Sequence, residues 1–421
     1  MAHLQRVAAF AAAALLTAGG AAAQQPTQRQ VDSLAAEVRA LEARLDSLRA
    51  VVGTAATPAG APSPVTPAAD TGLAALRAAA VAAAGADTTT PAADTSATTR
   101  FSGHERSQSQ LNPEIGATGD VRAYAQSPGQ GNNFDPREFE IGFQSALDPY
   151  SHTKIFVSLE NDHVEVEEGY AYWIGLPGHL RFDIGAFRQQ FGELNRWHLH
   201  ALPETEYPLA LRAYFGDDGL SGTGISLYRA FGGLGTHELT GQVTLSRSDD
   251  LLFAGGTRPS YLLHLLNFWQ LSPATYMQVG LSGLYGTNPD SSLKTGVAGL
   301  EFRLTWRPPE QTLYRDWTLR GELLALRKDY GGAANTRWGG YLSTTYKLDQ
   351  RWIVGARWDY VEAPASGLVT QQLVPSLTMW QSEWVFLRAQ YTWSKPESLD
   401  ATSQLAVQIV WAIGPHKHET Y

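Results

Sequence analysis

Repeated stretches of nine to twelve residues, in which apolar and polar side chains alternate, dominate the second part of the chain. In residues 351–360, for example, Trp352 and Trp358 fall on one face of an extended strand, while Arg357 and Asp359 fall on the other. Strands of ordinary sheets have about 5–6 residues, whereas a tilted strand needs about 9–11 residues to cross a bilayer. The pattern therefore restricts the chain to a protein built from long β-strands.

A soluble β-sandwich also alternates, but two further features favour a transmembrane β-barrel. Charged residues stand in the middle of the polar faces, where a water-filled lumen tolerates them and a packed core does not. Aromatic residues stand at the ends of the apolar faces, as membrane-interface girdles require. These aromatic residues are Trp306, Trp317, Trp338, Tyr346, Trp352, Tyr360 and Trp393.

We predict an all-β, antiparallel barrel of about sixteen strands in residues 111–421. An even number returns both ends of the barrel to the same side of the membrane. The predicted strands are 115–125, 137–147, 153–161, 163–174, 179–187, 222–230, 236–246, 260–270, 274–284, 295–306, 313–326, 336–347, 351–361, 371–381, 383–394 and 403–413. Short turns alternate with longer polar loops, which we expect outside the cell at 126–136, 188–221, 247–259, 285–294, 327–335, 362–370 and 395–402.

The first 110 residues have a different composition and divide into three predicted parts. Residues 1–23 resemble a secretory signal peptide, with Arg6, a short apolar run and an Ala-rich cleavage site. Residues 28–53 carry apolar residues at alternating steps of three and four, which favours a periplasmic coiled coil over a single amphipathic helix. Residues 54–110 are rich in Ala, Pro and Thr, as is typical of a disordered linker. We therefore expect export and a location in the outer membrane.

Composition excludes several classes of function. The chain has no Cys, which rules out disulfides, thiolate metal sites and a cysteine nucleophile. Its net charge of −9 makes it a poor partner for nucleic acids. No motif of a hydrolase, metalloprotease or nucleotide-binding protein is present. The expectations are no cofactor, no nucleic-acid partner and no enzymatic activity, although barrel enzymes exist and a missing motif is weak support.

The segment 188–221 is the longest predicted loop and contains many apolar and aromatic residues, which a solvated loop does not need. We predict that it folds into the lumen and forms a pore constriction. The candidate constriction residues are Arg188, Arg196, His198, His200, Glu204 and Arg212. The arginines could instead pair with Glu193 and Glu204 to hold the loop. A metal site of His198 and His200 with Glu204 and Glu206 is the less favoured alternative to histidines that simply pack, so no metal is expected.

Charges on the predicted inner faces of the strands have both signs. They include Arg122, Glu138, Glu140, Arg181, Asp183, Glu301, Arg303, Arg320, Glu322, Arg357, Asp359 and Arg388. Rings of one charge select the opposite ion, so this mixture predicts weak ion selectivity, with cations as the possible preference.

The residues 185–192 (GAFRQQFG) resemble the G-x-F-K/R-x-x-F-G motif of the phosphate-selective porin O and P family, and the segment 219–224 (GLSGTG) resembles that family's return to the next strand. The resemblance implies a trimeric sixteen-stranded barrel, a third loop folded into the lumen and passive diffusion of anions. The chain departs from the family because residues 101–421 hold only 6 Lys and 19 Arg against 34 acidic residues. Phosphate selectivity is therefore not expected.

The leading interpretation is an outer-membrane porin for small ions and hydrophilic solutes, with membrane lipid, the barrel-assembly machinery and two further copies of itself as partners. One alternative is a closed barrel that anchors the coiled coil, which aromatic filling of the lumen by Trp384 and Phe386 would favour. A barrel enzyme is the third and least favoured reading.

Overall fold

A computed structural model describes residues 113–414, except 130–131, 161–162, 248–251, 254–257, 289–292 and 333. The predicted signal peptide, coiled coil and linker all lie outside the described residues. In the described part, no helix is long and apolar enough to cross a membrane.

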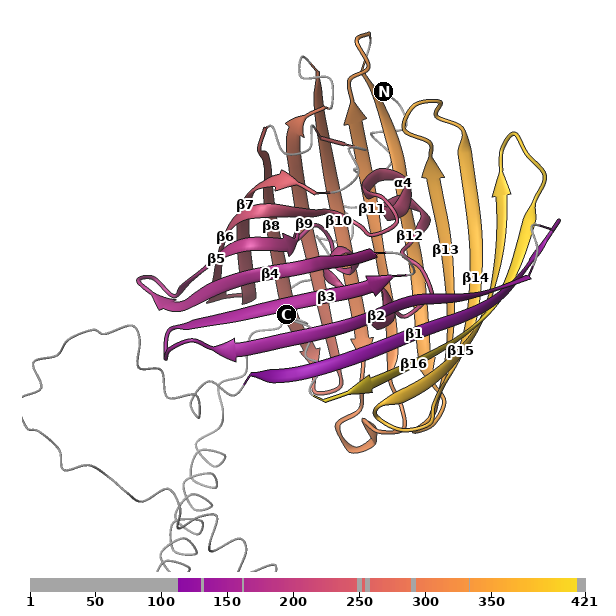
Figure 1. Cartoon of the computed structure of the whole chain (residues 1–421), viewed down its shortest axis with the longest axis horizontal. Coiled ribbons are helices and arrows are strands. Elements are labelled where there is room, and N and C mark those ends of the chain that lie inside the picture. The colour runs from indigo at the N-terminus through magenta and orange to yellow at the C-terminus, as the bar shows by residue number, and fades with distance from the viewer. Residues whose placement is uncertain are drawn as a thin grey trace, which may run out of the picture. The chain divides into compact units, whose positions relative to one another are not determined.

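Sixteen antiparallel strands form one closed barrel, in which each strand pairs with its neighbours in sequence (Figure 1). The barrel closes between the first and the last strand, whose register runs from Ala117 opposite Ile413 to Ser127 opposite Ser403. The strands are β1 (Glu114–Ser127), β2 (Asn132–Ala146), β3 (Ser151–Glu160), β4 (His163–Leu176), β5 (Leu180–Arg188), β6 (Ser221–Gly233), β7 (Gly235–Ser246), β8 (Ser260–Ser272), β9 (Thr275–Thr287), β10 (Lys294–Trp306), β11 (Trp317–Lys328), β12 (Asn335–Lys347), β13 (Trp352–Glu362), β14 (Val369–Trp380), β15 (Val385–Pro396) and β16 (Thr402–Ile413).

The predicted number and order of strands are confirmed, but two boundaries are wrong. The expected loop at 126–136 is mostly strand, because β1 and β2 remain paired as far as Ala125 opposite Asn132. Pro136 lies at a bulge, because Asp120 pairs with Glu138 whereas Arg122 pairs with Asp135. A proline at a bulge removes no ladder hydrogen bond. β11 begins at Trp317 instead of residue 313, because the short helix η4 (Pro309–Gln311) and a turn precede it.

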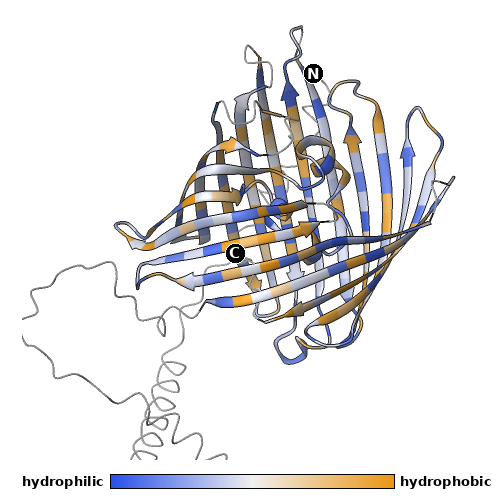
Figure 2. Cartoon of the chain, viewed as in Figure 1, coloured by the Kyte–Doolittle hydropathy of each residue, from blue (hydrophilic) through white to orange (hydrophobic). Residues whose placement is uncertain are grey.

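The two faces of the barrel wall differ in polarity, and the hydropathy alternates along most strands (Figure 2). Large apolar side chains such as Leu281, Leu300 and Trp358 are exposed on the outer face. Their neighbours on the same strands, such as Ser282, Glu301 and Arg357, are buried on the inner face. This arrangement meets the requirement of a bilayer, because the closed ladder pairs the backbone groups of neighbouring strands and apolar side chains meet the lipid.

We expect Leu281→Arg to destabilise the barrel in a bilayer by about 2–4 kcal/mol, because Leu281 lies in the middle of β9 on the outer face and is 52% exposed. Equilibrium unfolding of the protein in lipid vesicles measures the change.

Leu271→Arg is the matched control, since Leu271 is also outward and exposed but lies near the end of β8. It should cost about 0–1 kcal/mol. Equal effects of the two substitutions would contradict the placement of the bilayer around the middle of the strands.

Candidate functional site

The segment 189–220, here called the inner segment, joins β5 to β6 and lies inside the barrel. It contains two short 3-10 helices, η2 (Leu194–Arg196) and η3 (Leu199–Ala201), and one helix, α4 (Leu209–Phe215). Figure 1 shows α4 within the ring of strands. The side chains of the inner segment contact inner walls on opposite sides of the barrel, as described below.

Asn195 holds the two ends of the inner segment together and is fully buried. Its Nδ2 donates to the carbonyl oxygens of Gln189 (2.8 Å) and Leu220 (2.9 Å), and its Oδ1 accepts from the backbone N–H of Leu220 (2.7 Å). The neighbouring Gly219 has a positive φ of 74°, and a Cβ there would press on Asn195 Oδ1. A glycine is therefore needed for this closure.

Gly192, the last residue of the GAFRQQFG motif, allows the backbone to approach the wall at β11. It has a φ of 62°, and a Cβ would collide with the carboxylate of Glu322. That carboxylate accepts hydrogen bonds from the backbone N–H groups of Glu193 (3.0 Å) and Leu194 (3.1 Å). The Gly192 N–H itself donates to Ser282 Oγ on β9 (3.0 Å).

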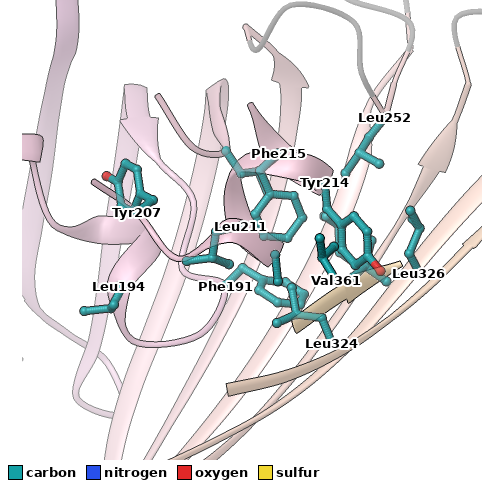
Figure 3. Packing of buried hydrophobic residues seen from close by; sticks show 14 of the residues in the cluster. Phe191, Leu194, Tyr207, Leu211, Tyr214, Phe215, Leu252, Leu324, Leu326 and Val361 are labelled. Carbon is teal, nitrogen blue, oxygen red and sulfur yellow. The ribbon is translucent and has the colours of Figure 1, made fainter. Parts of the chain in front are cut away.

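Apolar side chains of the inner segment form a buried cluster with the inner faces of β8 to β13 (Figure 3). Phe191 and Phe215 pack edge to face with ring centres 5.0 Å apart. Tyr214 packs beside the inward side chains of the strands, and its hydroxyl donates to the Glu362 carbonyl oxygen (3.2 Å). The wall side of the cluster consists of Leu262, Leu284, Val297, Leu324, Leu326, Tyr341 and Val361.

Polar contacts fix the inner segment to β12, β13 and β15. The carboxylate of Glu204 accepts from Ser343 Oγ (2.8 Å) and pairs with Arg357 (3.1 Å). Arg388 donates to the carbonyl oxygen of Leu202 (2.9 Å), and the backbone N–H of Thr205 donates to Gln390 (2.9 Å). All of these groups are buried, so their mutual pairing offsets the cost of taking them out of water.

Two histidines contact carboxylates of β2 on the opposite wall. His198 Nδ1 lies 2.5 Å from Glu140, and His200 Nδ1 lies 3.2 Å from Glu138. Burial alone would lower the pKa of His198, but the neighbouring carboxylates of Glu140 and Glu167 outweigh it and raise the pKa well above its usual value. The pKa of His200 is also raised, because Glu138 outweighs the effect of burial.

Glu206 forms partly exposed ion pairs with Arg122 of β1 (2.8 Å) and with Arg212 of α4. The side chains of Glu206 and Arg212 are 28% and 29% exposed. Burial works to raise the pKa of Glu206, but the two guanidinium groups outweigh burial and lower it. Arg212 also pairs with the exposed Asp217 (2.7 Å).

The six predicted constriction residues are all in or beside the inner segment but do not form one group. Arg188 is buried and pairs with Glu167 (3.0 Å), and Arg196 lines two small cavities beside β5–β7 and β8–β10. His198 and His200 face β2, Glu204 faces β12 and β13, and Arg212 pairs within the segment.

Two pairings that the sequence left open as alternatives differ from those in the structure. Glu193 pairs with the wall arginines Arg303 (2.8 Å) and Arg320 (3.3 Å), and Glu204 pairs with Arg357, so neither holds an arginine of the inner segment. The histidines meet carboxylates of the wall instead of Glu204 and Glu206. In both cases the partners in the structure are far apart in the sequence, so the sequence did not indicate them.

The charged residues predicted for the inner faces are mostly neutralised in pairs. Arg181 pairs with Asp183 (2.7 Å), Arg357 with Asp359 (2.9 Å) and Arg122 with Asp135 (2.9 Å). Glu301 lies 3.6 Å from His264, and Arg388 donates to Gln408 (3.0 Å).

A cavity of about 410 Å³ lies between part of the inner segment and the wall formed by β12–β16 and the start of β1. Its lining includes Leu202 and Pro203 of the segment, together with Phe386 and Arg388 of the wall. Trp384 and Phe386, which the sequence offered as aromatic filling of the lumen, line this cavity and leave it open. The aromatic residues that fill the lumen belong to the inner segment. The cavity lies mainly beside β14–β16, with Thr345 of β12 and Ile353 of β13 at its edge, whereas the cluster lies against β8 to β13.

Sequence reasoning missed Asn195, which positions the site, and the β-bulge that buries Glu167. Asn195 stands in a loop with no motif around it. Glu167 is buried by a β-bulge, where Phe156 pairs with Glu168 and Val157 with Val166. The doublet Glu167-Glu168 breaks the alternation of β4, and this break was the available signal for a bulge.

Comparison with known proteins gives a likeness of fold but not of sequence. No family model and no curated protein matches the chain. Among solved structures, Pseudomonas putida OprB is similar with a TM-score of 0.54, 8% identity and coverage of 73% of this chain and 95% of that one. The Acinetobacter baumannii outer-membrane channel DcaP has a TM-score of 0.52, 8% identity and coverage of 73% and 99%. A loop-deletion form of OmpT, an outer-membrane protein of Vibrio cholerae, has a TM-score of 0.51, 9% identity and coverage of 72% and 100%.

The prediction that the chain is not an enzyme is wrong, because it excluded an activity that the fold does not exclude. The same fold is shared by proteins with different names, OmpT among them, and identities of 8–9% carry the fold alone. The fold therefore neither shows an enzymatic activity nor rules one out.

The strand number, the closure, the apolar outer face and the likeness to OprB and DcaP agree with one another. The chain is a sixteen-stranded transmembrane β-barrel with the fold of outer-membrane porins.

Proposed function

We propose that the protein is an outer-membrane porin that lets small hydrophilic solutes and ions diffuse passively through a lumen narrowed by the inner segment. The observation that carries this proposal is the attachment of the inner segment to inner walls on opposite sides of a barrel of sixteen strands, a size at which an open lumen leaves an aqueous channel.

The proposed path for solutes lies between the inner segment and the wall formed by β14–β16, β1 and β2. The apolar cluster occupies the side of β8 to β13, where water and ions are excluded. The cavity of about 410 Å³ lies mainly beside β14–β16. The partly exposed charges of Arg122, Asp135, Glu206 and Arg212 also gather beside β1 and β2.

We propose weak ion selectivity for this path, because its charged groups have both signs and neutralise one another at close range. Arg122, for example, contacts the carboxylates of both Asp135 and Glu206. An anion-selective path would need unpaired cations in a ring.

Membership of the phosphate-selective porin O and P family, and assembly as a trimer, remain part of the proposal. The motif glycines Gly192 and Gly219 support the first, because each occupies a position where a side chain would collide with the wall or the segment. The heptad pattern of residues 28–53 supports the second. Insertion by the barrel-assembly machinery and a periplasmic N-terminus follow from the same proposal.

A closed barrel that anchors the N-terminal coiled coil is the second candidate, and one observation favours it. The buried cluster around Phe191, Tyr214 and Leu324 is packed like a protein core and not like the wall of a channel. Conductance distinguishes the two functions.

We expect discrete conductance steps from the refolded mature chain in a planar bilayer. Replacing residues 196–216 by a short Gly–Ser linker keeps Asn195 and Gly219 and should raise the conductance at least about two-fold, since it removes most of the material inside the barrel.

Shortening the β15–β16 loop at residues 397–401 is the control and should leave the conductance unchanged, because no described residue of that loop contacts the inner segment. A silent wild type with a conducting 196–216 variant would support the closed anchor. Silence of both variants, each shown to be folded, would overturn the porin proposal.

Arg122→Gln should shift the reversal potential in a salt gradient toward greater cation preference. The substitution removes the positive charge between Asp135 and Glu206 and leaves two carboxylates beside the proposed path. The measurement is the reversal potential of multichannel membranes at about 0.1 M salt, where charges are screened over about 10 Å.

Arg307→Gln is its matched control. Arg307 stands in the connection between β10 and β11, is about half exposed and pairs with Asp316. An equal shift in both variants would mean that Arg122 acts through overall charge and does not lie beside the path.

A further inference from the structure

Four side chains converge between the inner segment and the wall: Glu138 and Glu140 of β2, Glu167 of β4 and His198. Each offers one ligand atom, and these atoms all lie within 4.8 Å of one another. His198 Nδ1 is 2.5 Å from Glu140 Oε2 and 2.8 Å from Glu167 Oε2. The side chain of Glu167 is 11% exposed and the other three are 2% exposed or less.

The β-bulge in β4 adds a carboxylate to this group. In a regular strand only one of Glu167 and Glu168 could face inward, but the register shift leaves Glu167 without a cross-strand partner, and both residues become buried. Bulges often occur where a side chain must be re-aimed toward a functional site.

The group also contains a buried oxygen that the protein does not satisfy. Glu138 is 1% exposed, and its Oε2 contacts His200, but its Oε1 has no hydrogen-bond donor among the described residues, and the carboxylate of Glu167 lies next to it. A buried carboxylate oxygen without a donor is costly. A bound cation would supply the missing partner.

The charges point in the same direction. Four carboxylates meet here when Glu168 is included, and they outnumber the basic side chains in contact with them, which are Arg188, His198 and His200. This balance of charges favours a bound cation.

We propose that Glu138, Glu140, Glu167 and His198 form a binding site for a divalent transition-metal ion of the zinc class. An imidazole nitrogen with carboxylate oxygens suits zinc, whereas magnesium and calcium prefer oxygen ligands alone. Tetrahedral zinc with bonds of about 2.0–2.1 Å needs ligand atoms about 3.3 Å apart. The ligand atoms now lie within 4.8 Å of one another, so binding would require the side chains to adjust.

Other groups around His198 suit the same role. If Nδ1 binds the metal, Nε2 faces Glu168 Oε2 at 3.6 Å, and a small approach of this carboxylate would let it accept a hydrogen bond from the imidazole and orient it. The ring of Phe156 packs edge to face on the imidazole, with centres 5.0 Å apart. The metal would join the inner segment to β2 and β4. This site does not depend on whether the lumen conducts.

The test is isothermal titration of ZnCl₂ into the metal-free, untagged mature chain, with His416 and His418 of the C-terminal tail changed to Gln so that they bind no zinc. We expect one zinc ion per chain, with MgCl₂ giving no comparable signal. Glu138→Gln should weaken zinc binding by more than about 100-fold, because loss of even an outer-shell partner costs about 10–100-fold.

His198→Ala should have the same effect, and His237→Ala is the control, since His237 lies on β7 beside Asn267 and away from the four residues. If His198→Ala does not fold, Glu138→Gln decides, because the amide preserves the shape of the side chain. Absence of zinc binding by the parent chain, or equal binding by Glu138→Gln, overturns the proposal. Neither result depends on conductance, so the site and the porin function can fail separately.

Discussion

The closure of the sheet between β1 and β16 is the constraint on which the rest of the structure depends. In lipid an open sheet edge would leave N–H and C=O groups without partners, each at a cost of several kcal/mol. The pairing of Ala117–Ser127 with Ser403–Ile413 removes that edge. Closure also separates an outer face that must be apolar from an inner face that can carry charge, and it creates the space that the inner segment fills.

Inside the barrel, the inner segment is held by two kinds of interaction on two sides. Toward β8–β13 it packs through apolar side chains such as Phe191 and Tyr214. Toward β1, β2, β13 and β15 it is held by buried ion pairs and hydrogen bonds, such as Arg357 with Glu204. Buried ion pairs contribute little net stability, but breaking one partner is costly. They fix the position of the segment more than they strengthen the fold.

The division of the lumen connects this architecture to both proposals. The apolar side excludes water, so any path for solutes must follow the polar side, where Arg122 and Glu206 are accessible. The cluster of Glu138, Glu140, Glu167 and His198 stands where the segment meets β2 and β4. A metal there would act on the same segment that narrows the proposed path.

The sequence by itself determined the sixteen strands, because a period of two over about ten residues is a local property that each strand carries alone, as residues 351–360 show. It also indicated that the segment 188–221 would not be an ordinary loop, since Phe191, Tyr214 and their neighbours are too apolar for solvent. Only the tertiary structure decided which charges meet. Glu204 and Arg357, or His198 and Glu140, are far apart in the chain, and their contact depends on how the segment crosses a closed barrel. The bulge that buries Glu167 likewise follows from pairing between strands, which no single strand specifies.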